Sequence, residues 1–214
     1  MTEPPPARPI QADAPHVLSS GAGLRCGTGE LPAAGLLAAC GLTFRPADDW
    51  QGSELAMVAE GMADLLAAAH WTPAACRVAL GGAITLIRDR NLPIVTDQAG
   101  TRYPVLGLYD ARQRTLTIND WSFDPRTGGE EGGRRVLLHE LAHAWDTRSR
   151  YLLSLWLRWL PGPRASGYAA TSRFEDWADA VMATVYGPEP GCESFAHPRS
   201  LRLRYVRCAF RRYR

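Results

Sequence analysis

Apolar and polar positions alternate along the chain with two different periods, and these periods predict where helices and strands lie. From Ser53 to His70, apolar residues recur every three or four positions, as expected for a helix that buries one face, and Ser53 is its predicted N-cap. A shorter apolar segment from Leu31 to Leu42 predicts an earlier helix. His70 ends the longer helix, where a histidine interacts favourably with the helix dipole, and we favour this structural role over a chemical one.

Strand-like spacing replaces helical spacing between Cys76 and Asn119. Three runs predict strands, and they are Ala83–Arg88, Pro104–Tyr109 and Thr115–Asn119. We predict that the second and third form a hairpin, because only a short polar segment separates them. The third run alternates polar and apolar residues, which predicts one solvated face, and we take it as the sheet edge on which an extended peptide can pair.

Two further helices are predicted in the second half of the chain. One is Arg134–Asp146, which follows a glycine-rich entry, and the other is Ser172–Tyr186, which ends before Gly187 and Pro188. Between them, Tyr151–Leu160 is strongly apolar but too short to span a bilayer. We favour a buried helix for this segment, with a membrane or partner contact as the alternative.

Composition divides the chain into three parts. Residues 1–30 are rich in Pro, Gly and Ser and predict a flexible tail. Residues 31–190 contain the predicted helices and strands and form one domain. Residues 191–214 are rich in arginine, interleaved with apolar residues from Arg199 onward. We favour a C-terminal segment packed on the domain with a solvated arginine face; binding to an acidic surface or to nucleic acid is the alternative.

The overall composition is that of a globular protein. The chain has 214 residues, of which 46% are hydrophobic, and its mixture of helices with a few strands predicts an α+β fold. Its 24 basic residues are all arginine and nearly balance 22 acidic ones. Charge therefore points to no partner, and nucleic acid is not an expected one.

The five cysteines form no C-x-x-C pair, which argues against a thiolate zinc site. In an oxidising compartment, Cys192 and Cys208 could form a disulfide. The N-terminus lacks the apolar core of a signal peptide, and no run of 18 apolar residues occurs. We therefore expect a chain that is cytoplasmic at synthesis, lacks a transmembrane segment and would need another route for export.

The predicted helix Arg134–Asp146 carries the motif H-E-x-x-H. His139 and His143 lie four residues apart, so their rings project from one face and can reach a single ion. Glu140 points about 100° around the helix from the first histidine. That direction places Glu140 beside the metal, where it can take a proton from a bound water.

A catalytic zinc ion needs a third protein ligand. A histidine six residues after His143 would continue the metzincin pattern, but position 149 is serine. No other histidine is well placed, so a carboxylate is expected. Glu175 and Asp179 share one face of the last predicted helix, which suits Glu175 as the ligand and Asp179 as an acceptor for a histidine N–H. Asp146 is a second candidate for such an outer role.

Tyr168 precedes the proposed carboxylate ligand by seven residues. A phenol near a metal can donate a hydrogen bond to the oxyanion that forms when water attacks a carbonyl. An ordinary amphipathic loop tyrosine would have the same spacing, so spacing alone leaves its role open.

The two-part pattern resembles the catalytic domain of the anthrax lethal factor type of zinc metallopeptidase. The resemblance covers roughly residues 105 to 187, through H-E-x-x-H-A-x-D at His139, then Tyr168 and E-x-x-A-D-A at Glu175. It implies a zincin-like domain of the H-E-x-x-H plus Glu (gluzincin) type. It also implies zinc ligands at His139, His143 and Glu175, a general base at Glu140 and an oxyanion donor at Tyr168.

This chain departs from the family pattern after the ligand glutamate. Asp176 stands where the family has an aromatic residue, and Asp179 stands where it has a glutamate. The large recognition and translocation domains of the toxin have no counterpart, so its substrate does not carry over.

These observations predict a zinc-dependent endopeptidase that acts on a protein or peptide through a Glu-activated water. Two alternatives remain at this point. One is a non-catalytic binding module that keeps the zincin fold, and the other is a nucleic-acid-associated protease that uses the arginine-rich C-terminus.

Overall fold

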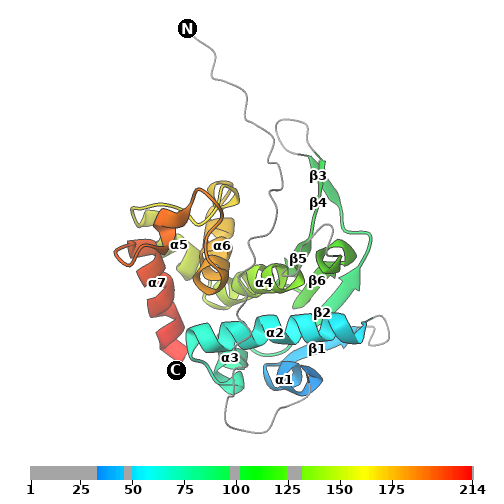
Figure 1. Ribbon diagram of the computed structural model, residues 1–214. Coiled ribbons are helices and arrows are strands. Elements are labelled where there is room, and N and C mark those ends of the chain that lie inside the picture. The colour runs from blue at the N-terminus through cyan, green and yellow to red at the C-terminus, as the bar shows by residue number, and fades with distance from the viewer. Residues whose placement is uncertain (1–32, 46–49, 97–101, 125–131, 214) are drawn as a thin grey trace. The chain divides into compact units, whose positions relative to one another are not determined.

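A computed structural model describes residues 33–45, 50–96, 102–124 and 132–213, which belong to the unit Leu31–Arg214 (Figure 1). The predicted tail 1–30 lies outside the described residues. The helices are α1 (Ala33–Ala39), α2 (Gly52–Ala69), α3 (Pro73–Ala79), α4 (Gly132–Arg148), α5 (Leu152–Trp159), α6 (Arg173–Tyr186) and α7 (Leu201–Phe210). Short 3-10 turns are η2 (Asp120–Phe123), η3 (Tyr168–Ala170), η4 (Glu193–Ala196) and η5 (Arg211–Tyr213).

A mixed four-stranded sheet has the order β1-β2-β6-β5. Strands β1, β2 and β6 run parallel, and β5 runs antiparallel to β6. Their bounds are β1 (Leu42–Arg45), β2 (Ile84–Asp89), β5 (Gly107–Asp110) and β6 (Thr115–Asn119). Strands β3 (Ile94–Thr96) and β4 (Arg102–Pro104) pair separately as an antiparallel ribbon. The chain is therefore α+β, as its sequence predicts, and its four-stranded sheet is small and mixed.

The β5–β6 hairpin and the bounds of β6 are as predicted, but β6 is not an edge strand of the sheet. Strand β6 pairs with β2 on one side and β5 on the other, so the edges of this sheet within the described chain are β5 and β1. The prediction of Thr115–Asn119 as the edge was wrong because Ile84–Asp89, which precedes the hairpin in sequence, pairs with the far side of β6.

Local capping accounts for two further differences from the sequence prediction. Helix α2 begins at Gly52 rather than after Ser53, because Gln51 is the N-cap and its backbone N–H donates to Glu54 Oε2 at 2.9 Å. Cys76 lies in helix α3 and not in a strand region, because the Thr72 hydroxyl accepts the Ala75 N–H at 3.1 Å.

Two predicted segments are divided in the structure. The early helix ends at Ala39, and Gly41, with φ of 88°, turns the chain into β1 at Leu42. The run Pro104–Tyr109 divides between β4 and β5, because Val105 and Leu106 lie outside both strands.

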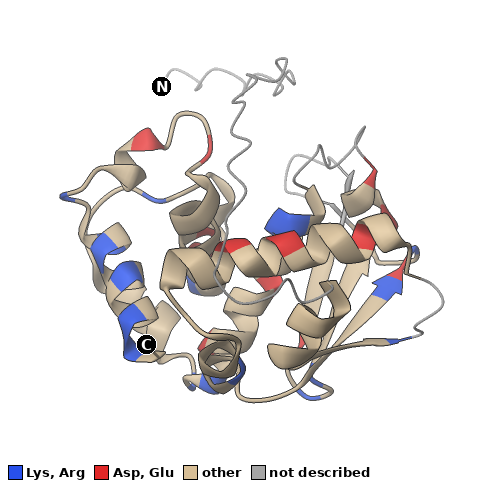
Figure 2. Ribbon diagram, turned by 60° about the horizontal axis from the view of Figure 1, so that its bottom comes forward, with Lys and Arg blue, Asp and Glu red and all other residues tan. Residues whose placement is uncertain are grey.

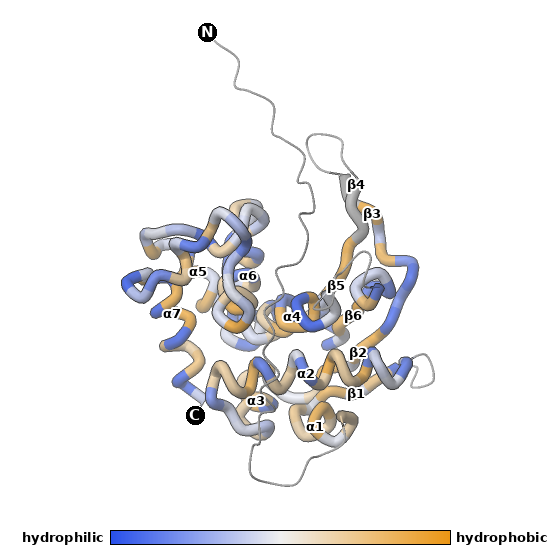
Figure 3. Tube along the Cα trace, viewed as in Figure 1, coloured by the Kyte–Doolittle hydropathy of each residue, from blue (hydrophilic) through white to orange (hydrophobic). Residues whose placement is uncertain are grey.

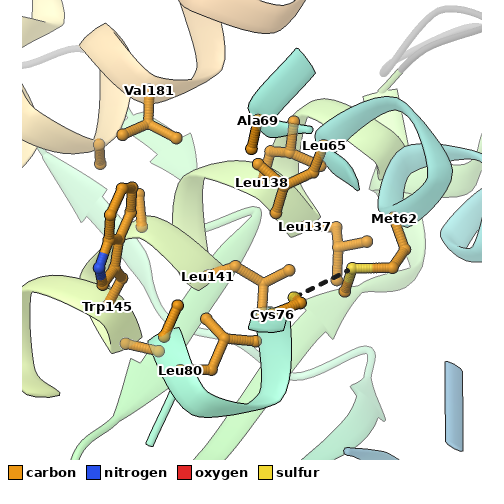
Figure 4. Close-up of a cluster of buried hydrophobic side chains, with 14 of the residues drawn as sticks. Met62, Leu65, Ala69, Cys76, Leu80, Leu137, Leu138, Leu141, Trp145 and Val181 are labelled. Atoms are coloured by element: carbon orange, nitrogen blue, oxygen red, sulfur yellow. Dashed lines mark hydrogen bonds between the residues drawn. The ribbon is translucent and has the colours of Figure 1, made fainter. Parts of the chain in front are cut away.

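Helix α4 lies at the centre of the hydrophobic core. It packs on β5 and β6 on one side and on α2 and α6 on others. Its side chains Leu137, Leu138 and Leu141 meet residues of α2 and α3 (Figure 4). Strands β1 and β2 bury alternate residues, namely Leu42, Ile84 and Leu86, and hydrophobic positions along both strands appear in orange in Figure 3. Helix α4 is therefore fixed by contacts with the sheet and with helices on other sides.

The cysteines show no disulfide among the described residues. Cys40 and Cys76 are fully buried thiols, whereas Cys192 and Cys208 are free and at least partly accessible. No helix within the described ranges is long and apolar enough to cross a membrane.

Helix α7 is held by a buried charge. The Arg202 guanidinium pairs with the Asp176 carboxylate of α6, and it also donates to the carbonyl oxygens of Leu157 at 3.1 Å and Leu160 at 3.2 Å. Nearby, Trp71 Nε1 donates to the Phe210 carbonyl at 2.6 Å. The end of the chain is therefore tied to α5, α6 and the end of α2.

Replacing Arg202 with methionine should destabilise the fold strongly. The substitution leaves Asp176 buried with only the longer Arg164 contact at 3.7 Å, and removing one partner of a buried pair typically costs about 3–5 kcal/mol. Urea denaturation followed by circular dichroism measures this loss. The exposed Arg204 on the same helix is the matched control, and Arg204→Met should change stability little. Equal stability of the two variants would contradict the role of the buried pair.

Candidate metal centre

Three side chains of the predicted motif meet between α4 and α6. His139 and His143 lie one turn apart on α4, and Glu175 lies in the first turn of α6. Their ligand atoms all lie within 4.8 Å of one another, and within the described residues theirs is the one group of His, Cys, Asp or Glu side chains that can hold a metal ion. Packing of α6 on α4 brings them together (Figure 1).

The spacing of these atoms suits a small metal ion. His139 Nε2 lies 2.8 Å from Glu175 Oε2, His143 Nε2 lies 3.4 Å from the same oxygen, and the two Nε2 atoms are 3.2 Å apart. Ligand atoms about 2.0–2.1 Å from a tetrahedral ion are separated from one another by roughly 3.4 Å. A small outward movement of Glu175 would therefore make the three atoms fit such an ion.

The start of α6 explains how Glu175 is placed. Ser172 is the N-cap, and its hydroxyl accepts the backbone N–H groups of Phe174 and Glu175, each at 3.2 Å. This cap fixes the first turn of the helix, from which the carboxylate reaches the α4 histidines. A carboxylate in this turn is also favoured by the helix dipole.

Asp179 orients His139 through the ring nitrogen that faces away from the other two ligands. The Nδ1–H of His139 donates to Asp179 Oδ1 at 2.9 Å, which directs Nε2 toward Glu175. The other carboxylate oxygen of Asp179 accepts a hydrogen bond from the Ser166 hydroxyl. Ser166 in turn accepts the Ala169 N–H at 2.9 Å. The outer role predicted for Asp179 matches this contact, and the orientation of His139 depends on the loop before α6.

Asp146 is placed differently. Its Oδ1 accepts the Ser154 N–H at 3.0 Å and thereby caps the start of α5. Its other oxygen is buried with no hydrogen-bond partner among the described residues. Among the described contacts, Asp146 therefore hydrogen-bonds to the start of α5 and not to a histidine ring.

Glu140 is buried between α4 and the edge strand β5. The backbone N–H of Tyr109 donates to its carboxylate, and burial raises the pKa of Glu140 above its ordinary value. A raised pKa makes a carboxylate a stronger base, which suits proton transfer from water.

The contact between β5 and α4 requires a glycine. A Cβ atom at Gly107 would lie 2.6 Å from Val136 Cγ1 and 2.8 Å from Glu140 Cγ, closer than such atoms approach. Gly107 therefore lets the strand reach the side chain of Glu140. Sequence reasoning missed this residue and Ser166, because a single glycine or serine carries no motif.

Tyr168 lies beside His139 at the surface. The two ring centroids are 6.1 Å apart, and the tyrosine is 56% exposed. The loop that carries it is held by Glu189, whose carboxylate accepts the Gly167 N–H at 3.1 Å. Burial of part of the ring raises the pKa of Tyr168, and the nearby Glu175 and Asp179 charges raise it further, so its hydroxyl keeps its proton at neutral pH.

The charges of the centre are strongly coupled. Burial lowers the pKa of His139, but its hydrogen bonds to Asp179 and Glu175 outweigh burial and raise that pKa to about 10. Burial raises the pKa of Glu175, yet the two histidines outweigh burial and hold it at about 2. The centre therefore carries a proton on His139 and a charged Glu175 at neutral pH.

No family model, curated protein or solved structure matches this chain. The assignment of the centre therefore rests on its own geometry. That geometry brings together His139, His143 and Glu175, with Glu140, Tyr168 and Asp179 around them.

Metal affinity should rise with pH. Because the pKa of His139 is raised to about 10, its Nε2 is protonated at neutral pH, and a metal ion must displace that proton to bind. Below about pH 10, the affinity for the metal should therefore increase about tenfold for each pH unit. Competition with a colour-changing chelator, corrected for its own protonation, measures this slope.

Asp179→Asn provides the internal comparison for this titration. It removes the charge of Asp179, one of the three carboxylates that raise the pKa of His139, so the rise in affinity should level off at a lower pH. An affinity independent of pH in the unmodified protein would contradict the protonation state described above.

Proposed function

We propose that this protein is a zinc-dependent endopeptidase. The observation that carries the proposal is the convergence of two imidazole nitrogens and one carboxylate oxygen beside a buried glutamate. Zinc in catalytic sites is commonly held by three protein ligands of this kind. Bound there, zinc would polarise the scissile carbonyl and acidify the attacking water.

The residues around the centre supply the remaining chemistry. Glu140 accepts the proton of the attacking water and later passes it to the leaving amine. Tyr168 donates a hydrogen bond to the developing oxyanion. Asp179 keeps Nδ1 of His139 protonated, so that Nε2 is available as a ligand.

Strand β5 is the surface on which we place an extended substrate. Among the described strands of this sheet, β5 pairs with β6 along one of its two sides. The Asn119 N–H donates to the Leu106 carbonyl at 2.8 Å, which makes Leu106 and Asn119 a hydrogen-bonded pair. Because antiparallel pairing alternates, the backbone groups of Gly107 and Tyr109 point away from β6. We therefore place an extended peptide beside Gly107, next to Glu140, by addition of a strand.

Substituting Glu140 with glutamine should separate metal binding from catalysis. The amide cannot accept the proton from water, so kcat should fall about 10²–10⁴-fold while zinc content stays the same. Mass spectrometry of products from a mixture of denatured proteins measures cleavage, and elemental analysis measures zinc. Glu193, a fully exposed acid, is the control, and Glu193→Gln should keep full activity.

The result also decides between the proposal and its alternative. Undiminished cleavage by Glu140→Gln would overturn the mechanism. Zinc binding that stabilises the fold, without cleavage by the unmodified protein, would instead favour a non-catalytic binding module.

Tyr168→Phe should lower kcat about a hundredfold with KM and zinc content nearly unchanged, because the hydroxyl acts on the oxyanion and not on the bound substrate. Steady-state kinetics on a cleaved peptide measures both constants. Tyr213→Phe, in the C-terminal turn η5, is the control. A rise in KM without a fall in kcat would show that Tyr168 only binds substrate.

A further inference from the structure

Helix α5 exposes an apolar face that is not covered by the described chain. Leu153, Ser154 and Leu157 face the core. Leu152, Trp156 and Trp159 lie on the opposite side, at spacings of four and three residues, and are 50%, 61% and 73% exposed. Large apolar side chains gathered on one face mark an interaction surface. The predicted buried helix is thus buried on one side only.

The segment that contains this helix carries charges of a single sign. Residues 147–174, between Asp146 and Glu175, contain five arginines and no acidic residue. Four of these arginines are exposed, and two of the four, Arg150 and Arg158, lie within two residues of the apolar residues in sequence. Residues 147–214 together carry twelve arginines against five acids, although the whole chain is nearly neutral. Figure 2 shows the same excess along α7, which packs beside α5.

This combination selects the kind of partner. A second copy of the chain would bring like charges together, which opposes self-association through this face. A peptide would need pockets for its side chains. Hollows of about 310 Å³ occur elsewhere, beside Arg88 and beside His70. An anionic lipid surface needs no pocket, attracts arginine and accepts tryptophan at the boundary between headgroups and acyl chains.

We propose that α5 binds anionic membrane surfaces by inserting Trp156 and Trp159 among the lipids while Arg150 and Arg158 contact the phosphates. The helix then lies in the plane of the interface and does not cross the bilayer. This inference is independent of the metal centre, because none of these four residues is among its candidate ligands or their hydrogen-bond partners.

Vesicle co-sedimentation tests the proposal with the full chain. Vesicles of phosphatidylcholine mixed with phosphatidylserine should bind the protein, and binding should weaken as salt is added. Vesicles of phosphatidylcholine alone should bind it at least about tenfold more weakly. Tryptophan fluorescence should shift to shorter wavelength only with the anionic vesicles.

Two double variants divide the contributions. Trp156→Ser with Trp159→Ser should reduce binding at least about tenfold and abolish the fluorescence shift. Trp121→Ser is the matched control, because Trp121 is 50% exposed but lies in η2, outside this segment. Arg150→Gln with Arg158→Gln should reduce binding and its salt dependence, and provides a second test if the tryptophan variant does not fold.

Three outcomes would overturn the proposal. The first is no binding to anionic vesicles, which would leave a protein partner as the occupant of the face. The second is unchanged binding by both double variants, which would assign lipid contact to another surface such as α7. The third is equal binding to neutral and anionic vesicles, which would remove the role of the arginines.

Discussion

The close packing of α6 against α4 is the constraint on which the candidate site depends. Two histidines on one helix can orient themselves toward an ion, but the third ligand comes from a separate element that must be held within hydrogen-bond distance. That element is held by the Ser172 cap and by the hydrogen bond that His139 donates to Asp179. The buried pair of Asp176 and Arg202 extends the same support to α7, so the end of the chain braces the helix that carries Glu175.

Sequence reasoning recovers the parts of this site that obey a short local rule. Helical periodicity places the histidines on one face, and spacing of four residues pairs Glu175 with Asp179. The contact of Gly107 with Glu140 lies beyond such reasoning, because it depends on how close a strand comes to a helix that begins at Gly132, after the β5–β6 hairpin. The edge strand was misassigned for a related reason, since pairing of β6 with β2 is a long-range choice that no local pattern encodes.

The segment between α4 and α6 contains helix α5, which has one buried face and one exposed apolar face. Its apolar character suggests burial, and one face of α5 is indeed buried, with Asp146 capping the start of the helix. The other face presents tryptophan to solvent among arginines. The same segment leads through Ser166 to Tyr168, so one connection both orients His139 and carries the surface we assign to lipid.

The central claim is that His139, His143 and Glu175 form a zinc centre, and X-ray absorption spectroscopy of the zinc-loaded protein tests it most directly. The account predicts one zinc ion per chain, coordinated by two imidazole nitrogens and by oxygen, at about 2.0–2.2 Å. It also predicts that Glu175→Ala binds zinc much more weakly while the fold is retained. A sulfur ligand, a histidine count other than two, or unchanged zinc affinity in Glu175→Ala would contradict the account.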